Sequence, residues 1–193
     1  KYESADRIYV SSWTLLTLAS NDPVVNEVAS GVKAESFRFG SGQFGVYTVP
    51  FIVPAGDGAK VLEYYGTDTV LNAEAAKRLD VELDATKPVT ALVTAGGRQY
   101  QASAGSFYAS LDSVFGLSAE DPLVNDTASG VKSTWWSENA GVIVYSTAGL
   151  RFAEGIHALA YRSMDNVGNV EVARSTTILV DNTAPVTEHH IGS

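Results

Sequence analysis

Two stretches of the chain share nine identical residues in the same order: DPVVNEVASGVK from Asp22 and DPLVNDTASGVK from Asp121, 99 positions apart. Other identical pairs recur at almost the same spacing: Asp68 and Asp165, Asn72 and Asn169, Glu74 and Glu171. Matches in a constant order, with an offset that changes by only one or two residues, indicate tandem modules. The period of about 98 residues is the size of one immunoglobulin-like sandwich.

The segments between the turns have the composition of β-strands. YVSSWTLLTLAS, VKAESFRF and FGVYTVPFIV are rich in aromatic and β-branched residues, and Gly, Pro, Asn or Asp separates them. GIHALAYRSMD and NVEVARSTTILVD predict a hairpin of two long strands around an Asn-Val-Gly turn. NAEAAKRLDVELD from Asn72 has a helical composition, but its counterpart from Asn169 is strand-forming, so we predict strands in both copies. The chain is therefore predicted to be all-β, with two tandem immunoglobulin-like β-sandwich domains.

The repeat also predicts the domain boundaries. Residues 1–86 form the first module, 87–184 the second, and 185–193 the start of a truncated third, because PVTEHHIGS aligns with PVTALVTAG from Pro88. KYESADRIYVS from Lys1 aligns with QYQASAGSFYAS from Gln99, which predicts that the first module lacks its first strand. An unpaired sheet edge is open to strand addition, so we expect the terminal segment of one molecule to complete the first module of the next.

Three segments carry a resemblance to a known family: ASGVKSTWW, GIHALAYRSMDNVGNVE and DNTAPVT. They resemble the bacterial Ig-like repeats of outer-membrane-protein type, more strongly in the second module than in the first, where Lys60 replaces His157 and Leu71 replaces Gly168. The resemblance implies a spacer or adhesive module within a larger secreted or cell-surface bacterial protein. It brings no catalytic residue with it.

Charge and composition narrow the possible partners. The chain has 22 acidic and 13 basic residues, a net charge of −9, and no basic run. Such a surface repels nucleic acid and anionic membranes and attracts cations. No apolar stretch approaches the ~20 residues of a membrane helix, so no membrane insertion is expected. The absence of cysteine rules out disulfides and thiolate metal sites.

No pattern of catalytic residues is recognisable. The three histidines are His157, in a strand whose other copy has Lys60, and His189 and His190 near the end of the chain. None is accompanied by a nucleophile and an orienting acid, and no phosphate-binding or zinc-protease motif occurs. We expect the chain not to be an enzyme.

Acidic and amide side chains gather in segments that an Ig-like topology brings to one end of the second module. Those candidates for a calcium site are Asp84, Asp121, Asn125, Asp126, Asp165 and Asn169. Ca²⁺ takes 6–8 oxygen ligands, so these residues together predict a calcium-stiffened joint with the neighbouring module. Asp22, Glu27 and Asp68 would form an equivalent, incomplete site at the front of the first module. The alternative is turn chemistry alone, because Asp and Asn favour turns through bonds to nearby amides.

The aromatic residues supply the predicted cores and one alternative function. We expect the cores to contain Trp13, Leu16, Leu18, Phe37, Val61 and Tyr64 in the first module, and Phe115, Leu117, Trp136, Ala158 and Tyr161 in the second. His157 is expected at a solvent-facing position. Trp135 should point away from Trp136, because side chains alternate along a strand. An exposed Trp135 could bind a glycan or a surface protein, which would make the chain an adhesive module.

Overall fold

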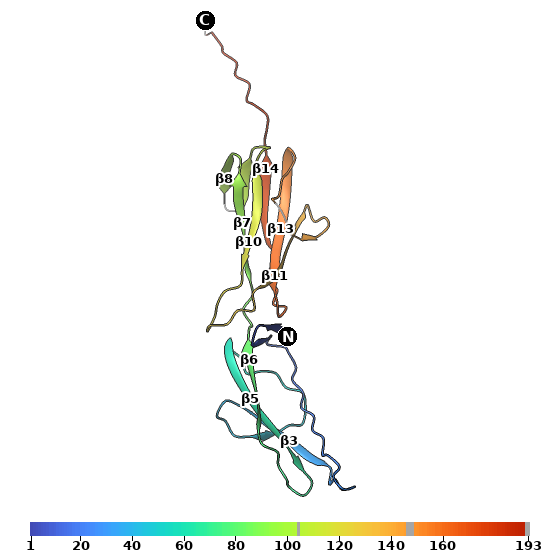
Figure 1. Ribbon diagram of the computed structural model, residues 1–193. Helices are drawn as coiled ribbons and strands as arrows, with labels where there is room; N and C mark the ends of the chain where they lie inside the picture. Colours follow the sequence, from blue (N-terminus) through green and yellow to red (C-terminus); the bar gives the residue numbers. More distant parts are fainter. Residues whose placement is uncertain (104, 146–148, 192–193) are drawn as a thin grey trace. The chain divides into compact units, whose positions relative to one another are not determined.

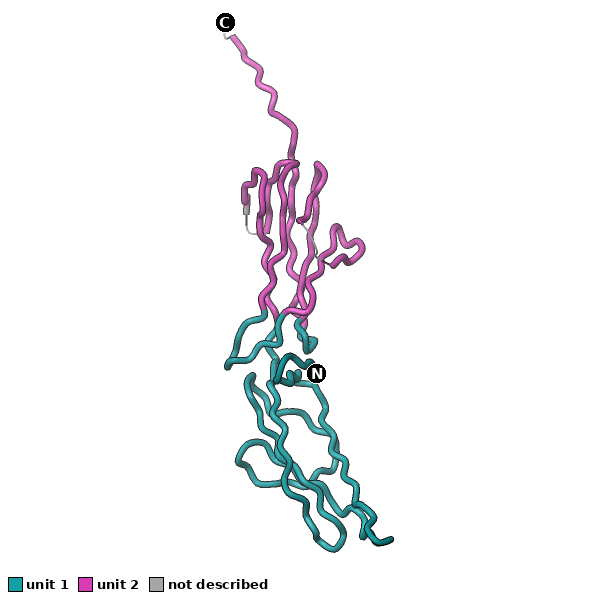
Figure 2. Tube along the Cα trace, viewed as in Figure 1, with its two compact units in different colours: residues 1–87, 121–130, 165–169 teal, residues 88–120, 131–164, 170–193 magenta. Residues whose placement is uncertain are grey.

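A computed structural model of the protein describes residues 1–103, 105–145 and 149–191, and the chain divides into two compact units (Figures 1 and 2). Unit 1 contains Lys1–Lys87, Asp121–Gly130 and Asp165–Asn169. Unit 2 contains Pro88–Glu120, Val131–Met164 and Val170–Ser193. Every regular element in the described ranges is a β-strand, which confirms the all-β prediction. Within the same ranges no helix has the length and apolar character needed to cross a bilayer.

Unit 1 is built on one six-stranded sheet with the order β1-β2-β6-β5-β3-β4. Its strands are β1 Tyr2–Ser4, β2 Arg7–Val10, β3 Val32–Phe39, β4 Gly45–Val46, β5 Gly58–Asp68 and β6 Lys77–Leu83. β2 runs parallel to the last strand, β6, and the other pairs are antiparallel. Val10, Val53, Val81 and Leu83 form the buried core on this sheet.

Unit 2 contains two sheets. Its strands are β7 Val89–Gly96, β8 Gln99–Ser103, β9 Ser106–Ala109, β10 Val114–Glu120, β11 Val131–Glu138, β12 Val144–Tyr145, β13 Gly155–Asp165 and β14 Arg174–Val180. β7 and β10 form one sheet, and the other has the order β12-β11-β13-β14-β9-β8. Phe115, Leu150, Phe152, Leu159 and Ile178 are the main members of the core that these strands bury.

The strand order identifies the fold. In unit 2 the run β12-β11-β13-β14 reproduces the C′-C-F-G order of one sheet of an immunoglobulin sandwich, and β7 with β10 supplies the A-B pair of the other. β9 then joins the first of these sheets by pairing in parallel with β14. The corresponding strands of unit 1, β4-β3-β5-β6-β2, lie in the same order. The chain is thus an all-β protein with two immunoglobulin-like repeats.

Several sequence predictions about the core are wrong. Ala158 is exposed and Leu159 is buried, because the buried face of β13 begins with His157, Leu159 and Tyr161, and Ala158 has the opposite parity. In β5, likewise, Leu62 is buried more fully than Val61.

Trp13, another expected core residue, is 57% exposed. Phe115 and Tyr161 are in the core of unit 2 as predicted, and Leu117 and Trp136 pack partly buried against it.

His157 is buried rather than solvent-facing. One ring nitrogen, Nδ1, lies 2.6 Å from Glu138 Oε1, and the other, Nε2, lies 2.8 Å from the carbonyl oxygen of Ala153. The ring packs against Phe152 with 5.0 Å between centroids. The prediction was based on Lys60, which occupies this position in the first copy. A lysine can lie half-buried and still keep its charged end in water, so Lys60 does not show that the position faces solvent.

Candidate metal site

The repeated DPxVNxxASGVK stretch builds a tight two-residue turn. In the second copy Val124 and Thr127 exchange two backbone hydrogen bonds of 3.0 and 2.9 Å. The two residues between them, Asn125 and Asp126, have φ values of 48° and 61°. Positive φ at both central positions is typical of a type I′ turn, and Asn and Asp tolerate that conformation better than most residues. The first copy forms the same turn, with Asn26 and Glu27 at φ 51° and 65°.

The aspartate that opens each repeat closes the loop by binding the glycine near its end. Asp121 Oδ2 accepts a hydrogen bond from the backbone N–H of Gly130 at 2.7 Å, and Asp22 Oδ2 accepts the same bond from Gly31 at 2.8 Å. Both glycines have a φ of +85°, which favours glycine. The spacing of Asp and Gly therefore has a turn-forming role in both copies.

Asp165 organises the second loop. Its Oδ1 atom accepts hydrogen bonds from the backbone N–H groups of Val167, Gly168 and Asn169 at 3.0, 2.7 and 2.8 Å. The side-chain amide of Asn169 donates to Asp165 Oδ2 at 2.5 Å and to the carbonyl oxygen of Asp84 at 3.1 Å. Asn169 thus connects this loop to the segment that follows β6.

Asp84 follows β6 directly and is completely buried. Its Oδ1 atom accepts a bond from the N–H of Thr86 at 3.2 Å, and its Oδ2 atom accepts one from the N–H of Ser129 at 2.8 Å. Asp84 is therefore fixed both to its own segment and to the repeated loop.

These bonds bring three carboxylates together. Asp84, Asp121 and Asp165 each offer an oxygen within 4.8 Å of the others, and all three belong to unit 1. Asp84 and Asp165 are fully buried, and Asp121 is partly buried. Asp121 Oδ1 is buried and has no hydrogen-bond partner among the described residues. Nor does any Lys, Arg or His in that part of the chain form an ion pair with the three carboxylates.

The electrostatics of the cluster are unfavourable without a cation. Burial raises the pKa of Asp121 to about 6, and the charges of Asp84 and Asp165 add to the effect while the Gly130 N–H opposes it. Burial also raises the pKa of Asp165, although the bonds from Asn169 act against it. Buried carboxylates that repel one another favour protonation or a bound cation. Hard oxygen donors of this kind are the ligands that Ca²⁺ prefers.

Two of the expected ligands make their contacts elsewhere in unit 1. Asn125 donates from Nδ2 to the carbonyl oxygen of Asp57 at 3.0 Å. The side chain of Asp126 is 87% exposed, and its Oδ2 atom lies 4.0 Å from an Arg7 nitrogen. The structure therefore groups Asp84, Asp121, Asp165 and Asn169, and gives Asn125 and Asp126 other partners.

The first repeat contains the same two loops, around Asp22 and Asp68, but no third carboxylate lies close to both of them in the described chain. Asn72 donates its backbone N–H and its side-chain amide to Asp68, both at 2.7 Å, as Asn169 does to Asp165. Asp22 and Asp68 do not belong to any close group of three acidic residues in the described chain. Glu27 is the second central residue of its turn.

Trp135 is half-buried on β11. Its ring lies 5.3 Å from the Arg162 guanidinium and 6.4 Å from the Tyr145 ring. Trp135 and Arg162 line a shallow hollow of 270 Å³, and the nearby Val142 and Tyr145 are 84% and 67% exposed. A half-covered indole beside exposed apolar residues can contact a partner of low polarity.

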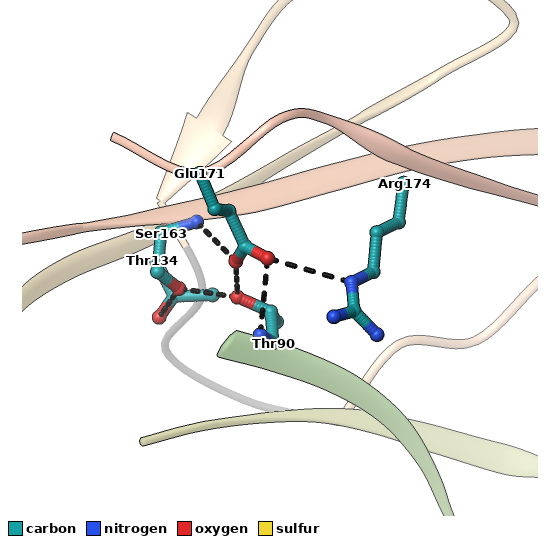
Figure 3. Close-up of polar contacts among 5 residues, drawn as sticks. All are labelled: Thr90, Thr134, Ser163, Glu171 and Arg174. Carbon is teal, nitrogen blue, oxygen red and sulfur yellow. Dashed lines mark hydrogen bonds and ion pairs between the residues drawn. The ribbon is translucent and has the colours of Figure 1, made fainter. Parts of the chain in front are cut away.

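Unit 2 contains a buried carboxylate that was not predicted from the sequence. Glu171 accepts hydrogen bonds from the backbone N–H groups of Thr90 and Ser163 at 3.2 and 2.9 Å and from the hydroxyl of Thr90 (Figure 3). Arg174 lies 3.4 Å away, and the Ser163 hydroxyl connects Thr90 to Thr134. The recurrence of Glu171 as Glu74 was the available signal. All of its partners lie within unit 2, and the full set of bonds gives it a structural role.

Fold and site together define a protein of immunoglobulin-like repeats with a buried carboxylate cluster. No protein-family model and no curated protein sequence matches the chain. Among solved structures, the fibronectin(III)-like modules of Clostridium thermocellum CbhA match it with a TM-score of 0.45 and 14% identity, over 96% of this chain and 95% of that one. This similarity is too low to assign a fold or a function. The immunoglobulin-like fold is assigned from the strand order.

Proposed function

We propose that this chain is a non-catalytic spacer within a larger secreted or cell-surface bacterial protein, and that calcium stiffens it where the two repeats meet in sequence. The observation that carries the proposal is the grouping of Asp84, Asp121 and Asp165. Asp84 ends the first repeat, and the other two lie in loops of the second. One ion held by all three would restrain the chain at that boundary.

The donors suit calcium better than a softer metal. All the candidates are carboxylate or amide oxygens, and the chain has no cysteine. Asp121 Oδ1 supports the proposal because it is buried without a partner. Asn169 would hold Asp165 in place through its amide. Asn125 and Asp126 are proposed as outer residues that could reach the ion only if their turn rearranged.

The proposed location follows from the expected affinity. Calcium affinity depends on the number of charged ligands and on the rigidity of the site, and extracellular calcium modules have dissociation constants of about 10⁻⁴–10⁻³ M. Calcium outside a cell reaches that range. A spacer of this kind would have neighbouring immunoglobulin-like modules of the same parent protein as its partners.

Isothermal titration calorimetry of CaCl₂ into the chain tests the proposal. The expected result is one site per chain, removed by Asp121→Asn and retained in the matched variant Asp22→Asn. Asp22 makes the same bond to a glycine outside the cluster, so it controls for loss of the turn. No heat of binding at millimolar calcium, or equal binding by both variants, would contradict the proposed site.

A second candidate function is adhesion to a glycan or a surface protein through Trp135. It is favoured by the hollow beside Trp135 and by the exposed Val142 and Tyr145. A glycan array tests it: saturable binding that Trp135→Ala removes and Tyr100→Ala retains would favour adhesion, since Tyr100 is 69% exposed on a different strand. Absence of binding would leave the spacer function.

A further inference from the structure

Unit 1 has an open groove beside the segment that corresponds to β10 of unit 2. β10 is paired along its length with β7. The corresponding residues 15–21 form, within the described chain, a single β-bridge, between Leu16 and Phe51, and the Ser20 N–H donates to Glu35 Oε1 at 3.1 Å. Two adjoining hollows of 540 and 250 Å³ lie along this segment, and both are lined by Ala19, Ser20, Glu74 and Lys77.

In unit 2 the corresponding place is occupied by β7. Thr90 on this strand makes hydrogen bonds that hold β7 to the rest of the unit. The Thr90 hydroxyl and backbone N–H both bind the Glu171 carboxylate, and the hydroxyl also lies 2.6 Å from Ser163 Oγ (Figure 3). Thr90 is fully buried, and Glu171 is only 7% exposed. The strand thus covers a carboxylate that is already held from two other sides.

Unit 1 holds the matching carboxylate in the same way but leaves it open. Glu74 Oε1 accepts a bond from the N–H of Gly66 at 2.9 Å, as Glu171 does from Ser163. Lys77 lies 2.7 Å from Glu74 Oε2, where unit 2 has Arg174 beside Glu171. The Glu74 side chain is 38% exposed, and it faces the groove where a threonine like Thr90 would bind.

The chain contains a second copy of the sequence that fills this place. Residues 185–191, PVTEHHI, align with PVTALVT from Pro88, so Thr187 corresponds to Thr90. The described residues 182–191 lie in no strand, and Val186 and Ile191 are each 88% exposed. A segment with strand-forming sequence and exposed apolar side chains is free to add to a sheet edge.

We propose that the groove of unit 1 is a strand-acceptor site, and that residues 185–191 of a second copy of this chain bind it. The incoming strand pairs with residues 15–21 as β7 pairs with β10, and Thr187 binds Glu74. Because donor and acceptor are different surfaces, the contact is heterologous and propagates head to tail instead of closing as a dimer. This interaction does not depend on calcium.

Sedimentation velocity of the full chain over a wide concentration range tests the contact. We expect reversible self-association that Thr187→Ser retains, because serine keeps the hydroxyl. Thr187→Val and Glu74→Gln should each weaken it at least tenfold. Thr187 lies in an exposed segment, so its variants leave the folded units intact. Association as strong in Thr187→Val as in the wild type, or a monomer at every concentration, would overturn the proposal.

Engineered cysteines test the register independently. Ser118 of β10 is the partner of Ala91 on β7, which places Ala19 opposite Glu188 in the proposed pair. Since the chain has no cysteine of its own, mixing Ala19→Cys and Glu188→Cys chains should give a disulfide-linked pair, and mixing Val142→Cys with Glu188→Cys should not. Equal crosslinking in the two mixtures would overturn the assigned register. A doubly substituted chain that crosslinks only within itself would exclude a second copy as the occupant.

Discussion

The backbone N–H of Gly130 donates to Oδ2 of Asp121 at 2.7 Å, while Oδ1 of the same carboxylate is buried with no partner in the described chain. Gly31 makes the same bond to Asp22 at 2.8 Å, at a place where no three carboxylates meet. Asp22 therefore shows the turn-forming role alone. A substitution that has an effect at Asp121 but not at Asp22 reports on the carboxylate cluster and not on the turn.

Asp121→Asn should raise the stability of unit 1 when calcium is chelated. The substitution keeps an oxygen for the Gly130 N–H and removes one charge from the cluster, so at pH 7.5 we expect a gain of roughly 1 kcal/mol in the free energy of unfolding. Urea unfolding in chelator measures it. Asp22→Asn should change stability by less than about 0.5 kcal/mol. A clear loss of stability in Asp121→Asn would show that its charge is needed by the turn.

The calcium-free chain should lose stability as the pH rises through about 6. Burial raises the pKa of Asp121 from 3.8 to about 6, so the folded state holds its proton more tightly than the unfolded state does. The resulting stability is fully present below pH 3.8 and is lost as the pH rises through 6. We expect a loss on the order of 1–2 kcal/mol after solvent screening, absent in Asp121→Asn. Parallel pH profiles of the two proteins in chelator would contradict this assignment.

Thr90→Val should destabilise unit 2. Valine has nearly the same shape but leaves the buried Glu171 carboxylate without the Thr90 hydroxyl, which typically costs about 1–3 kcal/mol. Thr94→Val is the matched control, because Thr94 lies on the same strand but is exposed. Chemical unfolding of both variants measures the difference. Equal effects would show that Glu171 does not need the Thr90 hydroxyl.

Phe115→Ala should destabilise unit 2 by about 3–5 kcal/mol, as removal of a buried aromatic ring typically does. Phe115 is 1% exposed and lies beside Phe107 and Phe152. Tyr108→Ala, at a position that is 47% exposed, should cost much less. Thermal unfolding followed by circular dichroism compares them, and similar losses would mean that the core lies elsewhere.

The sequence was sufficient to predict the architecture because the fold is repeated. Asp121, Gly130 and Asp165 have counterparts in Asp22, Gly31 and Asp68, and such pairs identify the turns by comparison alone. The alternation of polar and apolar residues then predicts strands between these turns.

The errors in the predicted core arose where a shift of one residue along a strand decides which side chain faces the core. Ala158 and Leu159 are both apolar, so only the tertiary structure decides which of them faces the core. Trp13 was also expected in the core, and it is 57% exposed.

The sequence predicted part of the candidate site. An Ig-like topology places Asp84, Asp121 and Asp165 at the same end of the second module, and the three carboxylates do lie close together. The sequence could not predict that Asn125 would bind Asp57, because the two residues are 68 positions apart in sequence and meet only in the folded chain. The role of Thr90 was also hidden, because its partner Glu171 is 81 residues away in sequence.

The proposed calcium site at Asp84, Asp121 and Asp165 can be tested by thermal unfolding of the wild-type chain in about 10 mM Ca²⁺ and in chelator. For a dissociation constant of about 10⁻⁴–10⁻³ M, Ca²⁺ at about 10 mM is in 10- to 100-fold excess and stabilises the folded state by about 1.4–2.7 kcal/mol. For a unit of about 100 residues this corresponds to a rise in Tm on the order of 10 °C. We expect that rise in the wild type and in Asp22→Asn, and we expect Asp121→Asn to lose it. Superimposable melting curves of the wild type in calcium and in chelator would contradict it and leave the loops with turn formation alone.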